Sequence, residues 1–238
     1  MRMRTGKLTA MMLVRNEADR YLTQTLDDLN RYVDAFVIVD DASTDRTVEI
    51  CASYDKVEKL IALKEHGFHN EVQLRKLCWR ETTATDAEWI LALDADEIFE
   101  ERMKTEIDGL LRREDVDAWA FPLYDFWGST EYYRSDRLWR AHEHHGVFLL
   151  RNKPFEEQWR ETPVHCGRIP SNVMQTFRVE KSDIRLKHYG WANRNEHAAK
   201  FERYMKADGE GKYGSLEQYY SILDPNPNLV KWEERHVR

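Results

Sequence analysis

The stretch Trp89-Ile90-Leu91-Ala92-Leu93-Asp94-Ala95-Asp96-Glu97 decides the fold, because an apolar run of strand length ends abruptly in acidic residues. Short continuous apolar runs are typical of strands that are buried on both faces, as in parallel sheets. We therefore predict a strand over residues 88–93. Parallel sheets bind their ligands at the carboxyl ends of the strands, so the acids that follow are expected at the edge of a ligand site.

Asp94 and Asp96 are separated by one small residue, so their carboxylates can converge on one cation. Oxygen ligands of this kind suit Mg²⁺ or Mn²⁺, and such a cation would act as a Lewis acid on a departing diphosphate. An isolated triplet of this type is more often an acidic loop whose charge favours the start of the next helix. Its place after a buried strand, beside two other polar strand ends, favours the metal site.

Two further predicted strands, residues 8–14 and 35–39, also end in polar residues. Arg15-Asn16-Glu17 follows the first, and Asp40-Asp41-Ala42-Ser43-Thr44-Asp45 follows the second. The remaining pattern predicts strands over 57–63, 117–124 and 184–188, and helices over 17–32, about 43–54, the region of 72–79, 100–113 and 193–207. This alternation indicates an α/β fold with a mainly parallel central sheet flanked by helices.

The composition of the chain argues against several classes of protein. The net charge of −7 argues against a nucleic-acid-binding protein, which needs a broad basic face. The three cysteines include no CxxC pair, so reduced thiols and a cytoplasmic location are expected. No secretion signal is evident at the N-terminus, and no apolar run approaches the ~20 residues of a transmembrane helix. Any membrane contact is therefore expected to be peripheral.

The three strand-end stretches, in this order and spacing, resemble family-2 glycosyltransferases, which are inverting enzymes with the GT-A fold. The matching segments are Leu13-Val14-Arg15-Asn16-Glu17, Phe36-Val37-Ile38-Val39-Asp40-Asp41-Ala42-Ser43-Thr44-Asp45-Arg46-Thr47 and the stretch over residues 89–97. The likeness is close over roughly the first half of the chain, with a looser echo at His188-Tyr189-Gly190-Trp191. It implies a GT-A domain that binds a nucleotide-sugar donor, a UDP-, GDP- or dTDP-sugar.

The resemblance also divides the chain by role. Residues 1–124 are the nucleotide-sugar-binding half, and residues 125–210 are an irregular acceptor-side half that completes the same domain. Residues 211–238, with Asp224-Pro225-Asn226-Pro227-Asn228, are expected to form a C-terminal tail, as a linker or mobile end.

By position, the resemblance implies that the backbone around Val14 and the carboxylates of Asp40 and Asp41 surround the nucleoside. The alternative for Asp41 is helix capping, and both roles can coexist. Arg75 is expected near the base or phosphates, or else as a solvated charge on its helix. The predicted donor-binding residues are Val14, Asn16, Glu17, Asp40, Asp41, Arg75, Asp94 and Ala95. The predicted metal ligands are Asp94, Asp96 and His188, because a late histidine often completes the site in enzymes of this fold.

The catalytic base is the least determined residue. An inverting transfer needs a carboxylate or histidine near the acceptor hydroxyl but away from the metal. The acidic pair that the family often carries in this region has no counterpart here, since Glu114-Asp115 lies too early. The candidates are Glu161, then Asp136 and His165.

The leading hypothesis is thus a metal-dependent, inverting glycosyltransferase in glycan or cell-surface polysaccharide synthesis, with a glycan, lipid-linked or protein acceptor. A nucleotidyltransferase is the second hypothesis, but it should show a glycine-rich loop after the first strand, where this chain has Arg15-Asn16-Glu17. A nucleotide-sugar-binding module without catalytic activity is the third.

Overall fold

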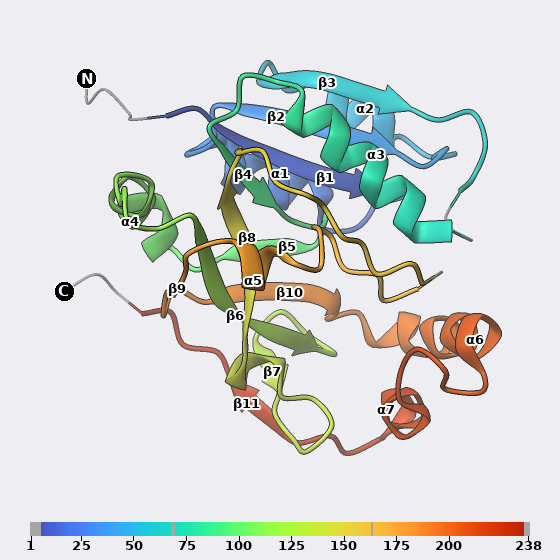
Figure 1. Ribbon diagram of the computed structural model, residues 1–238. Coiled ribbons are helices and arrows are strands. Elements are labelled where there is room, and N and C mark those ends of the chain that lie inside the picture. Colours follow the sequence, from blue (N-terminus) through green and yellow to red (C-terminus); the bar gives the residue numbers. More distant parts are fainter. Residues whose placement is uncertain (1–5, 68–69, 163, 236–238) are drawn as a thin grey trace.

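The computed structural model describes residues 6–67, 70–162 and 164–235 and has a parallel sheet at its centre (Figure 1). Strand β1 (Leu8–Val14) lies between β2 (Ala35–Asp40) and β4 (Trp89–Ala92) and is parallel to both. β3 (Val57–Ala62) extends the parallel set beyond β2. The predicted strands and the α/β class are confirmed, and the carboxyl ends of β1, β2 and β4 meet at one edge. Residues 1–5 of the predicted nucleotide-binding half lie outside the described residues.

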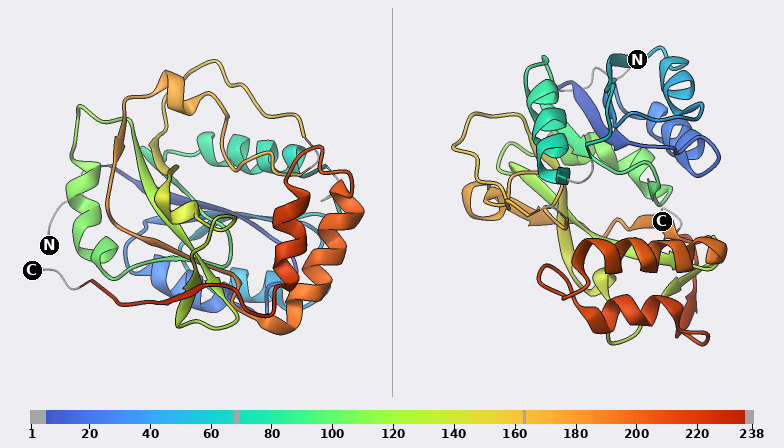
Figure 2. Two further views of the ribbon diagram at one scale, coloured as in Figure 1. Left: turned by 90° about the horizontal axis from the view of Figure 1, so that it is seen from below. Right: turned by 90° about the vertical axis from the view of Figure 1, so that its right-hand side faces the viewer.

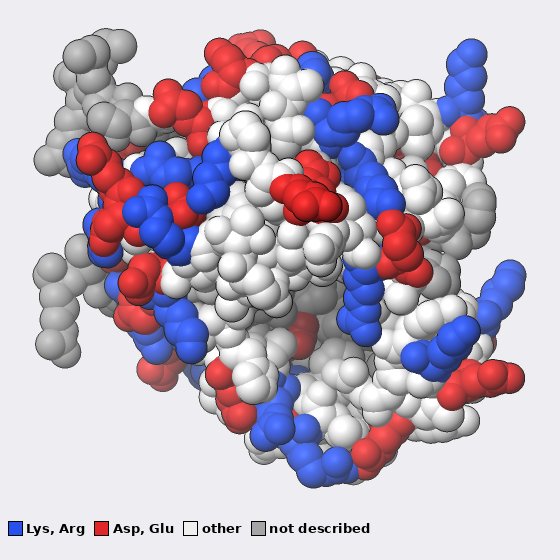
Figure 3. Space-filling model, viewed as in Figure 1, with Lys and Arg blue, Asp and Glu red and all other residues white. Residues whose placement is uncertain are grey.

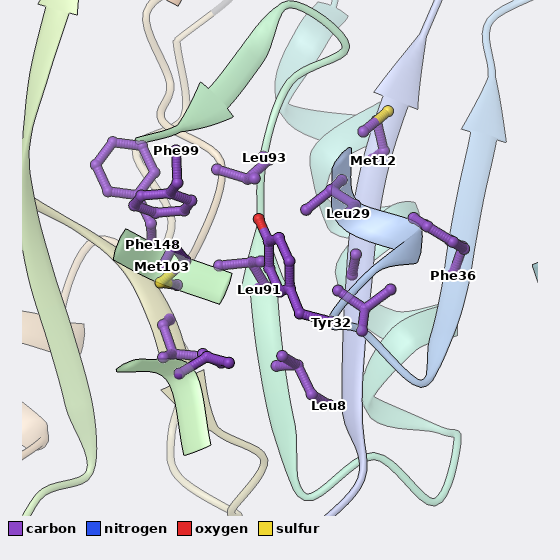
Figure 4. Packing of buried hydrophobic residues seen from close by; sticks show 14 of the residues in the cluster. Leu8, Met12, Leu29, Tyr32, Phe36, Leu91, Leu93, Phe99, Met103 and Phe148 are labelled. Carbon is purple, nitrogen blue, oxygen red and sulfur yellow. The ribbon is translucent and has the colours of Figure 1, made fainter. Parts of the chain in front are cut away.

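Helices cover both faces of the parallel strands (Figure 2). α1 (Leu22–Asn30) and α2 (Thr47–Ala52) pack on one face, and α3 (Glu71–Thr83) packs on the other. β1 serves both cores, because alternate side chains point to opposite faces of a strand. Met12 faces Leu29 and Phe36 in the core that Figure 4 shows, whereas Met11 packs in the core beneath α3. Each fully buried side chain of this size contributes roughly 1.5–3 kcal/mol.

Beyond β4 the sheet continues with antiparallel strands. β8 (His145–Arg151) lies between β4 and β6 (Ala118–Trp127), and β7 (Tyr132–Arg134) follows β6. The expectation that the acceptor-side half over residues 125–210 is irregular is therefore wrong in part, since β8 is a central strand of the sheet. The remaining elements of this region are η2 (Ala141–Glu143), α5 (Val173–Thr176) and β9 (Val179–Lys181), which pairs with β6.

A second set of strands brings the C-terminal half to the edge of the site. β10 (Leu186–Trp191) pairs antiparallel with the short strand β5 (Glu97–Phe99) and parallel with β6. This register places His188 opposite Glu97 on one side and Asp125 on the other. α4 (Arg102–Leu111) follows β5 and packs against the core on the α1 face.

The C-terminal segment is structured. η3 (Arg194–Glu196) leads into α6 (His197–Asp208), and α7 (Leu216–Tyr220) and η4 (Ser221–Leu223) pack beside it. β11 (Leu229–Lys231) then pairs antiparallel with β7 (Figure 1). The expectation of a linker or mobile end is wrong for residues 211–235, because buried Tyr219 and Ile222 anchor the segment. Over the described ranges, no helix has the length and apolar character to cross a bilayer.

Candidate active site

The first cavity lies where β1, β2 and β4 end. It has a volume of about 320 Å³. Its lining includes Val14, Glu17, Asp41, Arg75, Asp94, Ala95, Asp96, His188, Lys200 and Arg203. These residues come from elements that are far apart in the sequence, and six of the eight predicted donor-binding residues are among them. The topological edge predicted from the sequence is therefore a real cavity.

Asp41 is fixed at the wall of this cavity. Its N–H donates to the Val14 carbonyl at 2.9 Å, which ties the end of β2 to the end of β1. The carboxylate is fully buried and accepts the N–H of Gly67 at 2.6 Å, and His66 Nδ1 lies 2.6 Å from its other oxygen. A buried carboxylate needs such partners. The contacts hold Asp41 in one orientation toward the cavity.

Asp40 and Asn16 are not in the lining of the first cavity, and their contacts are local. Asp40 accepts the N–H of Ser43 at 2.9 Å and binds the Ser43 hydroxyl. Asn16 has a positive φ of 50° and accepts the N–H of Thr44 at 2.8 Å. The Asp40 side chain therefore orders the loop after β2, and the Asn16 side chain joins the loop after β1 to it. Between the two neighbouring aspartates, Asp41 is the better placed to contact a ligand.

Asp94 is engaged by two arginines. Arg75 on α3 donates to its Oδ1 at 2.7 Å, and Arg168 lies 3.5 Å from its Oδ2. Burial alone would raise the pKa of Asp94, but the charges of Arg168 and Arg75 outweigh it and hold that pKa well below its usual range. The Arg75 side chain is only 13% exposed and lies beside Asp94, so the alternative of a solvated charge on its helix does not describe it.

Asp96, in the turn between β4 and β5, faces His188 on β10. Asp96 Oδ1 lies 3.8 Å from His188 Nε2, and His188 Nδ1 lies 2.7 Å from Asp125 Oδ1. Burial would lower the pKa of His188, but the Asp96 charge and the Asp125 hydrogen bond outweigh it and raise that pKa to about 9. Asp125 thereby orients the ring so that Nε2 faces Asp96. A carboxylate commonly orients a metal-binding histidine in this way.

This arrangement is compatible with the predicted divalent cation as an open site. Within the described residues, no three His, Cys, Asp or Glu side chains are already grouped as a metal site. Asp96 and His188 nevertheless supply a carboxylate and an imidazole, which suit Mn²⁺, and Mg²⁺ sites commonly use one or two carboxylates plus phosphates and waters. Asp94 would join them by exchanging part of its contact with Arg75. The donor chemistry thus fits a cation that a diphosphate helps to bind.

A second cavity of about 770 Å³ opens beside the first and shares Arg75, Asp94, His188 and Arg203 with it. Residues that line the second cavity but not the first include Glu97, Asp125, His165, Arg168 and Lys206. The face drawn in Figure 3 is hollowed in its lower half, with acidic side chains visible inside the hollow. Over the rest of this face acidic and basic side chains are interspersed, without the broad basic surface that nucleic-acid binding requires.

The three predicted bases lie in different places. Glu161 is exposed and paired with Lys76, and it lines neither cavity. Asp136 also lies outside both cavities, where it accepts the Nε–H of buried Arg134 at 2.6 Å. His165 lines the second cavity, and its Nε2 is 2.8 Å from Tyr219 Oη. The structure therefore places one of the three candidates in the cavity that Asp94 also lines, and not the other two.

Several site residues were not predicted from the sequence. Asp125 orients His188, and Glu97 accepts two hydrogen bonds from Arg168. Asp125 could have been found by extending the strand predicted over 117–124 by one residue, since it lies on the same strand within an aromatic run. Arg168 had no signal, because it reaches the site from a long irregular segment.

Glu17 has an environment that makes stability depend on pH. Its Oε1 accepts from Arg20 at 3.0 Å, but among the described residues its buried Oε2 has no hydrogen-bond partner. Burial is the main cause that raises the pKa of Glu17 from 4.5 to about 7; Arg20 opposes the shift and the Asp96 charge adds to it. The folded protein therefore retains a proton that the unfolded chain releases above pH 4.5. Stability is expected to fall as pH rises from about 4.5 to 7.

Replacing Glu17 with glutamine should remove this loss. We expect Glu17→Gln to stabilise the nucleotide-free protein by about 1–3 kcal/mol at pH 8 and to have little effect at pH 4.5. Thermal unfolding of both proteins between pH 4.5 and 8 measures the difference. Glu49→Gln, at an exposed position on α2, is the matched control. Equal pH dependence of Glu17→Gln and the unsubstituted protein would contradict the assignment.

The fold, together with the cavity that Asp94 and Asp96 line, defines a class of protein, the GT-A glycosyltransferases. The sequence comparison then gives the family: the model of "Glycosyl transferase family 2" matches residues 9–182. The chain belongs to glycosyl transferase family 2.

Relatives and solved structures agree with this family. An uncharacterized protein of Mycobacterium tuberculosis is 26% identical over 225 residues, covering 87% of this chain and 52% of the relative. An uncharacterized glycosyltransferase of Rickettsia bellii is 26% identical over 115 residues, which are 48% of this chain and 36% of the relative. The chain thus spans about half the length of the mycobacterial relative.

Among solved structures, S. aureus TarS has a TM-score of 0.56 at 15% identity, over 91% of this chain and 42% of TarS. Mannosyl-3-phosphoglycerate synthase from Rubrobacter xylanophilus has a TM-score of 0.51 at 14% identity, over 98% of this chain and 88% of the other. At these identities the likeness concerns the fold. It confirms the predicted GT-A architecture.

Proposed function

We propose that this chain transfers a sugar from a nucleotide-diphosphate sugar to a hydroxyl acceptor, with a divalent cation and with inversion at the anomeric carbon. The observation that carries the proposal is that Asp41, Asp94, Asp96 and His188 line one cavity. Two solved structures of similar fold are complexes of S. aureus TarS 1-349, one with UDP and one with UDP-GlcNAc. These complexes support a nucleotide-sugar ligand for the cavity of this chain.

The donor would bind along the ends of the parallel strands. Asp41, already oriented by Gly67 and His66, would accept hydrogen bonds from the base or ribose. Asp96 and His188, with Asp94, would hold Mn²⁺ or Mg²⁺, which supplies Lewis-acid stabilisation of the diphosphate. Lys200 and Arg203 line the same cavity and add positive charge near the leaving group.

In the transfer, the acceptor oxygen attacks the anomeric carbon while the bond from that carbon to the diphosphate oxygen breaks. The electron pair leaves with the nucleoside diphosphate, and the acceptor proton passes to a base. We assign His165 as the base, because it lines the second cavity. Tyr219 Oη lies 2.9 Å from Asp208 Oδ2 and donates to it, so His165 Nε2–H would donate to Tyr219 and leave Nδ1 free to accept a proton.

The proposed setting is glycan or cell-surface polysaccharide synthesis in the cytoplasm, with peripheral contact at the inner face of the membrane. UDP-, GDP- and dTDP-sugars are the candidate donors, and glycan, lipid-linked and protein hydroxyls are the candidate acceptors. The described residues carry no feature that selects the nucleotide base. A screen must therefore identify the donor before the acceptor.

Removing the metal is expected to abolish tight donor binding. When the correct nucleoside diphosphate is present at 100 times its Kd together with Mn²⁺, the free energy of unfolding should increase by about 2.7 kcal/mol. This increase should raise the Tm by about 5–10 °C. EDTA should reverse most of this rise. Thermal unfolding with UDP, GDP and dTDP, each with Mn²⁺ or EDTA, measures it.

Each of the other outcomes of this screen would contradict a stated part of the proposal. A Tm rise that EDTA leaves unchanged would contradict metal dependence, and no rise with any nucleotide would contradict the donor site. Binding without turnover on any acceptor would indicate a module without catalytic activity. Once a product forms, the anomeric configuration read by NMR tests inversion directly.

A further inference from the structure

Three basic residues form a row along α6, at intervals of three residues: Lys200, Arg203 and Lys206. Residues at this spacing lie on one side of a helix. Lys200 and Arg203 line the first cavity, whereas Arg203 and Lys206 line the second. Lys206 is absent from the lining of the first cavity. The row therefore runs from the first cavity to the second.

The acidic groups in the second cavity are engaged by cations other than Arg203 and Lys206. Glu71 and Asp94 contact Arg75, Glu97 contacts Arg168, and Asp125 contacts His188. Each of these pairs is within ion-pair distance and at least partly buried. None of these contacts involves Arg203 or Lys206, so neither of these two cations is paired with an acid of the cavity wall.

Arg203 and Lys206 also lack acidic partners elsewhere in the part of the chain that the structure describes. In residues 6–67, 70–162 and 164–235, no carboxylate oxygen lies within 4.0 Å of either side chain. Arg203 contacts the ring of Tyr204 at 5.6 Å, and both basic side chains are exposed to solvent at the cavity. The helix dipole favours a cation in the last turn, which accounts for Lys206 on its own but not for Arg203.

We propose that Arg203 and Lys206 bind an anionic group of the acceptor, a phosphate or a carboxylate, and so define the acceptor class. The inference rests on the proposed function, because it assigns the second cavity to the acceptor. A cavity of about 770 Å³ lies in the size range of small-molecule sites. Arginine and lysine both bind these anions, and fixing a remote charge orients the attacking hydroxyl.

The test uses matched neutral and anionic probes on the full chain saturated with its nucleoside diphosphate and Mn²⁺, so that the first cavity is filled. Glycerol 3-phosphate is compared with glycerol, and glucuronate with glucose, by isothermal titration. We expect each anionic probe to bind at least ten times more tightly than its neutral counterpart. The affinity should fall as NaCl rises from 50 to 300 mM, because these side chains are exposed.

Two variants locate the effect. Lys206→Gln should weaken the binding of the anionic probes by 3–10-fold and leave nucleotide affinity within twofold. Lys181→Gln, at an exposed position on β9, makes the same change in net charge away from both cavities and should alter neither. Arg203→Gln should weaken both probe and nucleotide binding, since Arg203 lines both cavities.

Equal binding of neutral and anionic probes, or equal effects of Lys206→Gln and Lys181→Gln, would overturn the anion site. If the proposed function itself is wrong, the chain will not bind any nucleoside diphosphate, and this result is distinct from the loss of the anion site. In that event the same probes are titrated against the nucleotide-free chain. Preference for the anion that depends on Lys206 would then still support an anion site, and its absence would exclude one.

Discussion

Replacing Asp96 with asparagine is expected to reduce sugar transfer by about 10²–10³-fold at saturating donor and metal. Asparagine keeps the shape of the side chain but removes the charge that faces His188 at 3.8 Å. Losing one electrostatic contact that stabilises a developing charge typically costs a factor of this size. The measurement is release of the nucleoside diphosphate with the donor identified by the thermal screen.

The control for this experiment is Asp115→Asn. Asp115 is exposed and pairs with Arg113 away from both cavities, so its loss should change the rate less than twofold. The Asp96 side chain makes no hydrogen bond within the described residues, so Asp96→Asn should fold, and loss of the 3.8 Å contact with His188 should lower the Tm by no more than about 4 °C. Transfer at the unsubstituted rate in Asp96→Asn would remove the metal site from the proposal.

The parallel strands could be predicted because each carries its own signal. β1, β2 and β4 are apolar runs that bury both faces, and the same local pattern places polar residues after them. Such strands are recognised without knowledge of their partners. The cavity edge, with Asp41, Asp94 and Asp96, followed from the topology that these runs imply.

The other half of the sheet depends on contacts between distant residues. β8 has His145 and Gly146 at its start and Arg151 at its end, so its apolar part is too short to mark it as a central strand. β5 has three residues and exists because β10 pairs with it. Neither strand can be recognised until the tertiary structure supplies its neighbours.

The choice between Asp40 and Asp41 shows the same limit within one motif. The two residues are identical and adjacent, so the sequence alone gives both the same chemistry. Asp40 ends β2 and turns toward Ser43, whereas Asp41 turns toward Gly67 and the cavity. Gly67 lies on a segment after β3 whose position no local pattern indicates.

Glu97 is expected to be the residue whose loss most destabilises the site. It is buried, it accepts the Asp94 N–H at 2.9 Å, and it binds the guanidinium of Arg168 through both oxygens. Removing one partner of a buried ion pair typically costs 3–5 kcal/mol, because the other charge is left uncompensated. We therefore expect Glu97→Ala to lower the Tm by roughly 6–20 °C, at about 2–4 °C per kcal/mol.

A matched variant separates charge from packing. Glu97→Gln keeps the volume and one acceptor for the Asp94 N–H but removes the charge that holds Arg168. Arg168 should then move toward Asp94, which lies 3.5 Å away, and compete with the cation for its carboxylate. Donor affinity in the presence of Mn²⁺ should fall about tenfold in Glu97→Gln, while Glu58→Gln at an exposed position on β3 leaves it unchanged. Unaltered nucleotide binding in Glu97→Gln would show that Arg168 is held by its surroundings rather than by this carboxylate.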